Sequence, residues 1–203
     1  MEISAEDKRR VSAAIYAAEA GTSGEIVCVF TKASSDAMAL PIVLAAAISL
    51  ALPWVFVAMT EMPIRRILVL QLVTFVVAAL LLCQQRIRVA LMPRAARRAV
   101  ANQVAMQQFR SYGVVRTRDR TGILIFVSLA ERYARIIVDE GIAARVPQSV
   151  WQQAVDVLVR HMREGRIAEG FVAATELCGT VLATHFPSDA TNPNELRNRL
   201  HVI

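Results

Sequence analysis

Apolar residues recur at helical spacing in several segments of the chain. Val11, Ile15 and Ala18 lie on one face of a segment that starts at Ser4 and stops before Gly21. A hydroxyl residue before the first turn and a glycine after the last are typical of helix ends. The first segment is therefore predicted to be an amphipathic helix, and the same spacing predicts further helices over 93–112, 150–162 and 171–185.

Short runs rich in β-branched residues predict strands. Such runs cover 25–30, 123–129 and 133–141, and each is bounded by glycine or by polar residues. The second and third runs are close enough to form an antiparallel hairpin. Their near-continuous apolarity predicts central strands that are covered on both faces.

Two longer apolar runs suit a lipid bilayer. Residues 40–59 contain no charge, and residues 67–83 are interrupted only by Gln71 and Thr74. At about 1.5 Å per residue, the first run can cross the hydrocarbon core and the second is at the lower limit. We predict two transmembrane helices, over about 40–59 and 65–84. A buried helical pair in a soluble core is the alternative, but a domain this small could hardly cover both helices.

The predicted spans divide the chain into four parts. Residues 1–36 carry the first helix and strand, 37–85 form the transmembrane hairpin, 86–186 carry the remaining strands and helices, and 187–203 form a polar, irregular tail. The order of elements predicts one α/β domain, a small mixed sheet flanked by helices, interrupted by a two-helix transmembrane hairpin.

Basic residues around the hairpin predict its orientation. The flanking basic residues are Lys32, Arg86, Arg88, Arg94, Arg97 and Arg98, whereas the connection holds Arg65 and Arg66. Because basic loops stay in the cytoplasm, both termini are expected there. Arg94, Arg97 and Arg98 also suggest a second hypothesis, an anionic-lipid surface beside the membrane.

Composition supports a membrane protein and narrows its chemistry. The 203 residues are 55% hydrophobic and 20% charged, with a mean hydropathy of +0.43 and a net charge of +6. A disordered chain is excluded by these values. Three widely spaced cysteines, Cys28, Cys83 and Cys178, favour free thiols over a disulfide framework.

The common catalytic motifs are absent from the sequence. It contains no GxxxxGK[ST], HExxH or GxSxG motif and no GxGxxG motif after a strand. Nucleotide-dependent, zinc-hydrolase and serine-hydrolase activities are therefore disfavoured. The basic run at Arg116, Arg118 and Arg120 has Asp119 inside it and no interleaved aromatic residue, so no nucleic-acid partner is expected.

Two carboxylates at strand ends form the candidate metal site. Glu25 begins the first strand, and Asp139 closes the third beside Glu140. Calcium and magnesium prefer oxygen ligands, so Glu25 and Asp139 would hold such an ion if the two strand ends are neighbours. The alternative is that both are ordinary acids at the ends of strands, facing water.

Several long motifs resemble the TPM-domain family. They are TSGEIVCVF (22–30), RTGILIFVSLAERYARIIVDEGIAARVP (120–147), EGRIAEGFVAATELCG (164–179) and HFP…NPNELRNRL (185–200). The chain is most similar to a short bacterial branch in which a transmembrane hairpin interrupts the domain after the first strand. This resemblance implies a TPM-like α/β sandwich in a bacterial inner membrane. It also implies one of several roles, namely phosphatase activity, divalent-cation binding, or assembly and repair of membrane complexes. Among the family's acidic positions, it points to Glu25 and Asp139.

Two functions follow as hypotheses. The first is a membrane-anchored interaction module that faces the cytoplasm and binds a membrane or membrane-associated protein, in assembly or maintenance of a membrane complex. The second is a metal-dependent phosphomonoesterase, with Glu25 and Asp139 holding Ca²⁺ or Mg²⁺ and Arg118 or Arg120 steadying the phosphate.

Overall fold

The computed structural model describes residues 3–34, 39–84, 87, 90–188 and 195–203. The chain divides into two compact units, of which one combines Met1–Ser34 with Ala99–Ile203 and the other is Ser35–Arg98. The second unit is thus inserted into the first.

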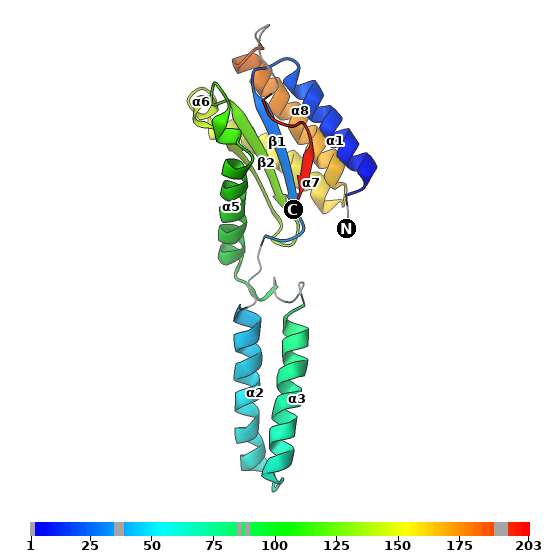
Figure 1. Cartoon of the computed structure of the whole chain (residues 1–203), viewed down its shortest axis with the longest axis vertical. Helices are drawn as coiled ribbons and strands as arrows, with labels where there is room; N and C mark the ends of the chain where they lie inside the picture. Colours follow the sequence, from blue (N-terminus) through cyan, green and yellow to red (C-terminus); the bar gives the residue numbers. More distant parts are fainter. Residues whose placement is uncertain (1–2, 35–38, 85–86, 88–89, 189–194) are drawn as a thin grey trace. The chain divides into compact units, whose positions relative to one another are not determined.

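A four-stranded mixed sheet lies at the centre of the first unit (Figure 1). Its strands follow the order β3–β2–β1–β4. They span Glu25–Thr31 (β1), Gly122–Ser128 (β2), Tyr133–Val138 (β3) and Leu200–Val202 (β4). β1 pairs in parallel with β2 and β4, whereas β2 and β3 are antiparallel. The predicted small mixed sheet and the antiparallel hairpin of β2 and β3 are confirmed.

Three helices cover one face of the sheet. They are α1 (Ala5–Glu19), α7 (Gln148–Arg163) and α8 (Ile167–His185). Side chains alternate between the faces of a strand, so Ile26, Cys28 and Phe30 of β1 all point towards these helices. Trp151 of α7 and Phe171 of α8 fill the space between helices and sheet. This is the larger of the two apolar clusters in the described residues.

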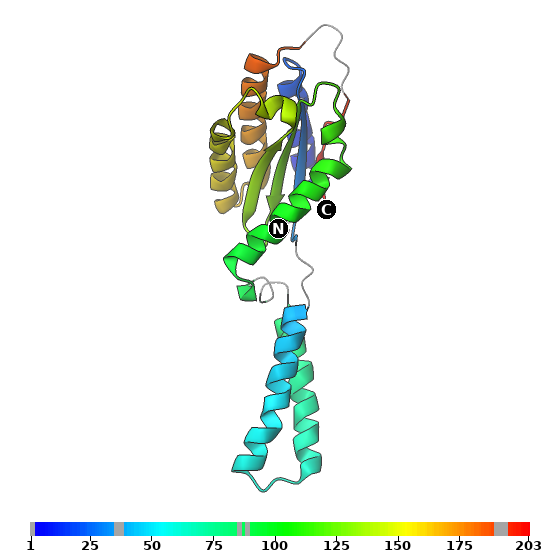
Figure 2. The same ribbon diagram turned by 90° about the vertical axis from the view of Figure 1, so that its left-hand side faces the viewer.

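The other face is covered by α5 (Arg94–Ser111) and the short 3₁₀ helix η1 (Val114–Arg116). Figure 2 shows α5 crossing in front of the strands. Val27 and Val29 of β1 pack there against Ala105 and Phe109 of α5. The domain therefore has three layers, helix, sheet and helix, which explains why every residue of β1 and β2 is buried.

Two expectations from the sequence are corrected by the sheet. β3 is an edge strand rather than a central one. Tyr133 and Ala134 are half-buried and Arg135 is exposed, because no further strand of the described residues pairs with β3. The segment 187–203 is not an irregular tail throughout, since it ends in β4, which lies beside the central β1.

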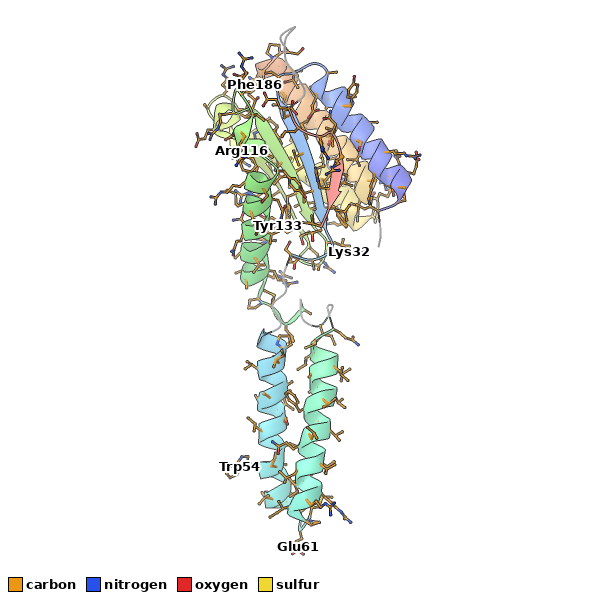
Figure 3. The ribbon with its side chains drawn as sticks, viewed as in Figure 1. Lys32, Trp54, Glu61, Arg116, Tyr133 and Phe186 are labelled. Carbon is orange, nitrogen blue, oxygen red and sulfur yellow. The ribbon has the colours of Figure 1, made fainter. Side chains whose placement is uncertain are left out.

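The second unit consists of two antiparallel helices. α2 spans Ala39–Met59 and α3 spans Ile64–Leu82. Most of their large apolar side chains are exposed, and Trp54 points away from α3 (Figure 3). By length and composition, three helices among the described residues are candidate membrane spans, over Pro41–Met59, Ile64–Leu82 and Ile167–His185.

Candidate binding site

The edge of the sheet at which β1 and β2 begin and β3 ends brings together the two carboxylates that the sequence singled out. Glu25 of β1 lies opposite Gly122 of β2, and the Asp139 amide donates to the Gly122 carbonyl oxygen at 2.9 Å. Glu25 and Asp139 therefore flank Gly122 at the same edge, as the cation hypothesis requires.

The Glu25 carboxylate is buried and accepts two backbone hydrogen bonds. The Glu195 amide donates to Oε1 at 3.0 Å and the Leu196 amide donates to Oε2 at 3.1 Å. Burial raises the pKa of Glu25, while these two bonds act in the opposite direction. The carboxylate thus ties the segment before β4 to the start of β1.

The Asp139 carboxylate also has partners on both oxygens. Oδ1 accepts the Glu140 amide at 2.8 Å, which caps the short helix α6 (Glu140–Ala143). Oδ2 accepts Nε of Arg120 at 2.9 Å, and the same guanidinium reaches Glu140 at 3.0 Å. Arg120 is itself held in the left-handed region, at φ 57°.

A divalent cation at Glu25 and Asp139 stays a prediction, because both carboxylates have other partners in this structure. Each carboxylate oxygen of Glu25 and Asp139 already accepts a hydrogen bond, and the Arg120 cation lies against Asp139. Within the described residues, no group of three or more His, Cys, Asp or Glu side chains is placed to hold a metal ion. The chemistry of this edge is that of structural cross-links between loops.

The opposite edge carries a buried polar network that sequence reasoning missed. It lies at the carboxyl ends of the parallel strands β1 and β2, where open α/β sheets commonly bind ligands. The Ser128 hydroxyl donates to the buried Glu131 carboxylate, which also accepts the Ser34 amide at 3.0 Å. The Ser34 hydroxyl donates to Ser128 Oγ at 2.9 Å. The network fixes the β2–β3 turn against the last described residues before the hairpin.

The same turn places Arg132 in the lining of a pocket. The turn adjoins β1, because the Leu129 and Ala130 amides donate to the carbonyl oxygens of Thr31 and Lys32, both at 3.0 Å. Arg132 adopts a left-handed conformation, at φ 51°, which is uncommon for a residue with a side chain. Figure 3 shows Lys32 and Tyr133 at this end of the sheet.

The pocket has about 480 Å³ of space and a mixed lining. Leu129, Ala134, Val159 and Met162 provide apolar surface, and Arg132 and Arg163 provide charge. Both arginines are exposed, and neither forms an ion pair with another described residue. Its volume lies within the usual range for ligand pockets. The arrangement suits a ligand that joins an anionic group to an apolar one.

No local signal marks this pocket in the sequence. Its lining comes from the β2–β3 turn and the start of β3 and from the last two turns of α7, which are about 25–30 residues apart in the chain. The arginines of the lipid hypothesis lie elsewhere, in the first turns of α5, where Arg94 and Arg98 are exposed.

Fold and site define a three-layer α/β domain with a basic, apolar-lined pocket beside its β2–β3 turn. The family model described as TPM domain matches residues 82–181, from the end of α3 into α8. The NMR structure of BA42 protein from the psychrophilic bacteria Bizionia argentinensis sp. nov. has a similar fold, with a TM-score of 0.62 at 19% identity. That likeness covers 100% of this chain and 97% of BA42. No curated protein matches the chain.

Residues 82–181 of the chain therefore match the TPM-domain family. The matched segment contains α5, β2, β3, α6, α7 and part of α8, and leaves out α1, β1 and β4.

Proposed function

We propose that the protein is a membrane-anchored binding module with its TPM domain in the cytoplasm. In this proposal α2 and α3 cross the inner membrane of a bacterium, and the domain binds a membrane-associated protein. The basic, apolar-lined pocket beside the β2–β3 turn is the observation that carries the binding role.

The proposal takes two of the three candidate spans as true spans. Only 11% of the apolar 18-residue stretch of α2 and 6% of that of α3 are buried, so both helices offer apolar surface on nearly all sides. Half of the corresponding stretch of α8 is buried, and Phe171, Ala174 and Leu182 of α8 are part of the core of the domain. Placing α8 in lipid would remove these side chains from the core.

The pocket favours a partner segment with a carboxylate next to an apolar side chain. Arg132 and Arg163 provide charge complementarity, because arginine binds carboxylates bidentately. The apolar lining would cover the neighbouring side chain. A protein partner in assembly or maintenance of a membrane complex would present such a segment near the bilayer surface.

Cysteine labelling of intact cells tests the orientation. Cys28 and Cys178 are buried, and burial raises the pKa of both thiols, so neither should react. Cys83 lies at the cytoplasmic end of α3 in this proposal, and Met62→Cys adds a thiol in the α2–α3 connection. A membrane-impermeant maleimide should label Met62→Cys from outside and label Cys83 only after lysis. Labelling of Cys83 in intact cells would contradict the orientation.

Photo-crosslinking tests the partner. A photoreactive residue at Val159, inside the pocket, should give a discrete crosslinked protein in membranes from cells that express the full chain. Arg132→Glu and Arg163→Glu should each remove that product. The matched control Arg110→Glu, on an exposed position of α5 across the sheet, should keep it.

Two results would contradict the hypothesis that the pocket binds a protein. One is a crosslinked product that both pocket substitutions leave unchanged. The other is that no crosslinked protein depends on Arg132 and Arg163, while the same two variants lose binding to phosphatidylglycerol vesicles. That combination would make a lipid headgroup the ligand.

The alternative function is a metal-dependent phosphomonoesterase, which is favoured by the name of the matching family model, TPM_phosphatase. Release of phosphate from a generic phosphomonoester, measured with and without Mg²⁺ or Ca²⁺, tests it on the full chain. Release that depends on the metal and is lost in Glu25→Ala and Asp139→Ala would support the enzyme. Equal release from these variants would reject Glu25 and Asp139 as its site.

A further inference from the structure

Gln71 lies close to the middle of α3. It follows Ile64, the first residue of the helix, by seven positions and precedes Leu82, the last, by eleven. At about 1.5 Å per residue, a span of this length places Gln71 well inside the hydrocarbon core, which is about 30 Å thick. Lipid chains offer no hydrogen bond there, so an amide at this depth requires a protein partner.

The described residues of α2 and α3 do not supply that partner. The Gln71 amide group has two donor hydrogens and one acceptor oxygen, and none of them forms a hydrogen bond within the described residues of α2 and α3. Ser49 of α2 is close, but its hydroxyl donates to the backbone carbonyl oxygen of Gln71 at 3.0 Å. A polar group left without partners in an apolar medium costs several kcal/mol.

The surface beside Gln71 is shaped for close approach of another helix. An open hollow of about 340 Å³ lies between the two helices of the hairpin. Gln71 lines this hollow together with Ala46, Ser49 and Leu50 of α2 and Leu68, Leu72 and Phe75 of α3. Ser49 is already buried against α3, whereas Ala46 is half-buried, and a small residue at this place allows the backbone of a neighbouring membrane helix to come close.

We propose that two copies of the chain associate within the membrane through this hollow, with each Gln71 amide hydrogen-bonded to the other. A second copy with the same topology brings its own Gln71 to the same depth. An amide is both donor and acceptor, so two identical amides satisfy each other across a two-fold axis. The inference rests on the proposed insertion of α2 and α3 into the bilayer.

Energy transfer between labelled copies in liposomes tests the association. Cys83 is half-buried, whereas Cys28 and Cys178 are fully buried, so the native chain accepts donor and acceptor dyes at one position. Full-length protein in phosphatidylethanolamine–phosphatidylglycerol liposomes should show transfer that falls as lipid is added. Gln71→Leu should require about 3- to 30-fold more protein per lipid for half-maximal transfer, the range reported for hydrogen bonds between membrane helices.

Two further variants control for the side chain and for its position. Gln71→Asn keeps an amide and should retain most of the transfer. Leu80→Ala changes a side chain nine residues further along α3, on the opposite side of the helix, and should leave the midpoint unchanged.

The result that overturns self-association is an equal midpoint for Gln71→Leu and the unchanged chain, or no transfer at any protein density. Flotation of the liposomes after a carbonate wash separates this result from failure of the proposed insertion. Protein that floats without energy transfer rejects the pair alone, and protein that does not float rejects insertion as well.

Discussion

Gly122 lies where β2 begins and where the backbone of η1 comes very close. A Cβ atom at this position would lie 2.5 Å from the carbonyl oxygen of Val114. Backbone atoms cannot move aside as a flexible side chain does, so Gly122→Ala should destabilise the domain by about 1–3 kcal/mol. Thermal unfolding of the full chain in detergent, followed by circular dichroism, measures the shift.

Gly21→Ala is the matched control for this substitution. A Cβ atom at Gly21 would meet only Ala183 Cβ, at an ordinary contact distance of 3.9 Å. Its melting temperature should stay close to that of the unchanged chain. Equal melting of the Gly122 and Gly21 variants would show that β2 and η1 can separate without cost.

Glu19, at the end of α1, should make stability depend on pH. Burial raises the pKa of Glu19 to about 8, although Ile26 N–H donates to its carboxylate at 2.7 Å and Asn198 also donates to it. The folded chain therefore keeps a proton that the unfolded chain loses above its ordinary pKa of 4.5. This contribution to stability is complete below about pH 4.5 and is lost as the pH rises to about 8.

Glu19→Gln removes the titrating group and keeps a side-chain oxygen for the Ile26 amide. The decrease in melting temperature between pH 5 and pH 8 should be smaller in this variant than in the unchanged chain. Glu25 also has a raised pKa and is present in both proteins, and its charge contributes to the raised pKa of Glu19, so the difference between the two decreases reports Glu19 together with its interaction with Glu25. Identical decreases would mean that Glu19 is ionised in the folded protein at neutral pH.

The residues of the candidate sites were predictable to different degrees. Glu25 and Asp139 stand out because strand ends can be recognised locally, and their meeting at one edge follows from the pairing of β2 with both β1 and β3. Their hydrogen-bond partners could not be foreseen, because the Glu195 and Leu196 amides come from a segment 170 residues away from Glu25. The pocket arginines were also missed, since only the folded turn brings Arg132 to α7.

Among the elements, the three-residue strand β4 is tied to the core and to β1. Its Leu200 is 6% exposed and lies in the core under α1, and Ile203 N–H donates to the Phe30 carbonyl oxygen at 3.0 Å. Leu200→Ala should destabilise the domain by about 2–3 kcal/mol, within the usual range for a buried leucine. Chemical denaturation of the full chain in detergent measures this loss.

Val202→Ala in the same strand provides the comparison, because Val202 is 41% exposed. Its loss of stability should be below about 1 kcal/mol. A Leu200 variant that is no less stable than the Val202 variant would show that β4 is dispensable.

Helices and long strands were predictable because their patterns are local. The Ser4–Asp7 capping box begins α1, and seven consecutive buried residues form β1. β4 was not predictable, because its three residues Leu200, His201 and Val202 have no pattern of their own. Their place beside β1 is set by tertiary pairing and not by local propensity.

At the scale of the whole molecule, the inserted hairpin should be removable, but the first 34 residues should not. β1 is a central strand of the sheet and comes from the segment before the hairpin. Replacing residues 35–98 with a flexible glycine–serine linker should give a domain that unfolds cooperatively without detergent, because all four strands are retained. Circular dichroism and denaturant titration measure this cooperativity.

A chain of residues 99–203 alone is the control. It lacks α1 and β1, so β2 and β4 have no strand between them, and it should show no cooperative unfolding. Cooperative folding of this fragment would mean that the sheet can form without its central strand.

The position of β1 before the hairpin also has a consequence for synthesis on the ribosome. β1 is complete about 90 residues before β2 begins to emerge, and at about 5–20 residues per second this is a delay of several seconds. During that time α2 and α3 are made, while β1 has neither of its neighbours and both of its edges are open. Unpaired strand edges are templates for pairing with other chains. β1 therefore has both edges unpaired throughout the interval in which α2 and α3 are translated.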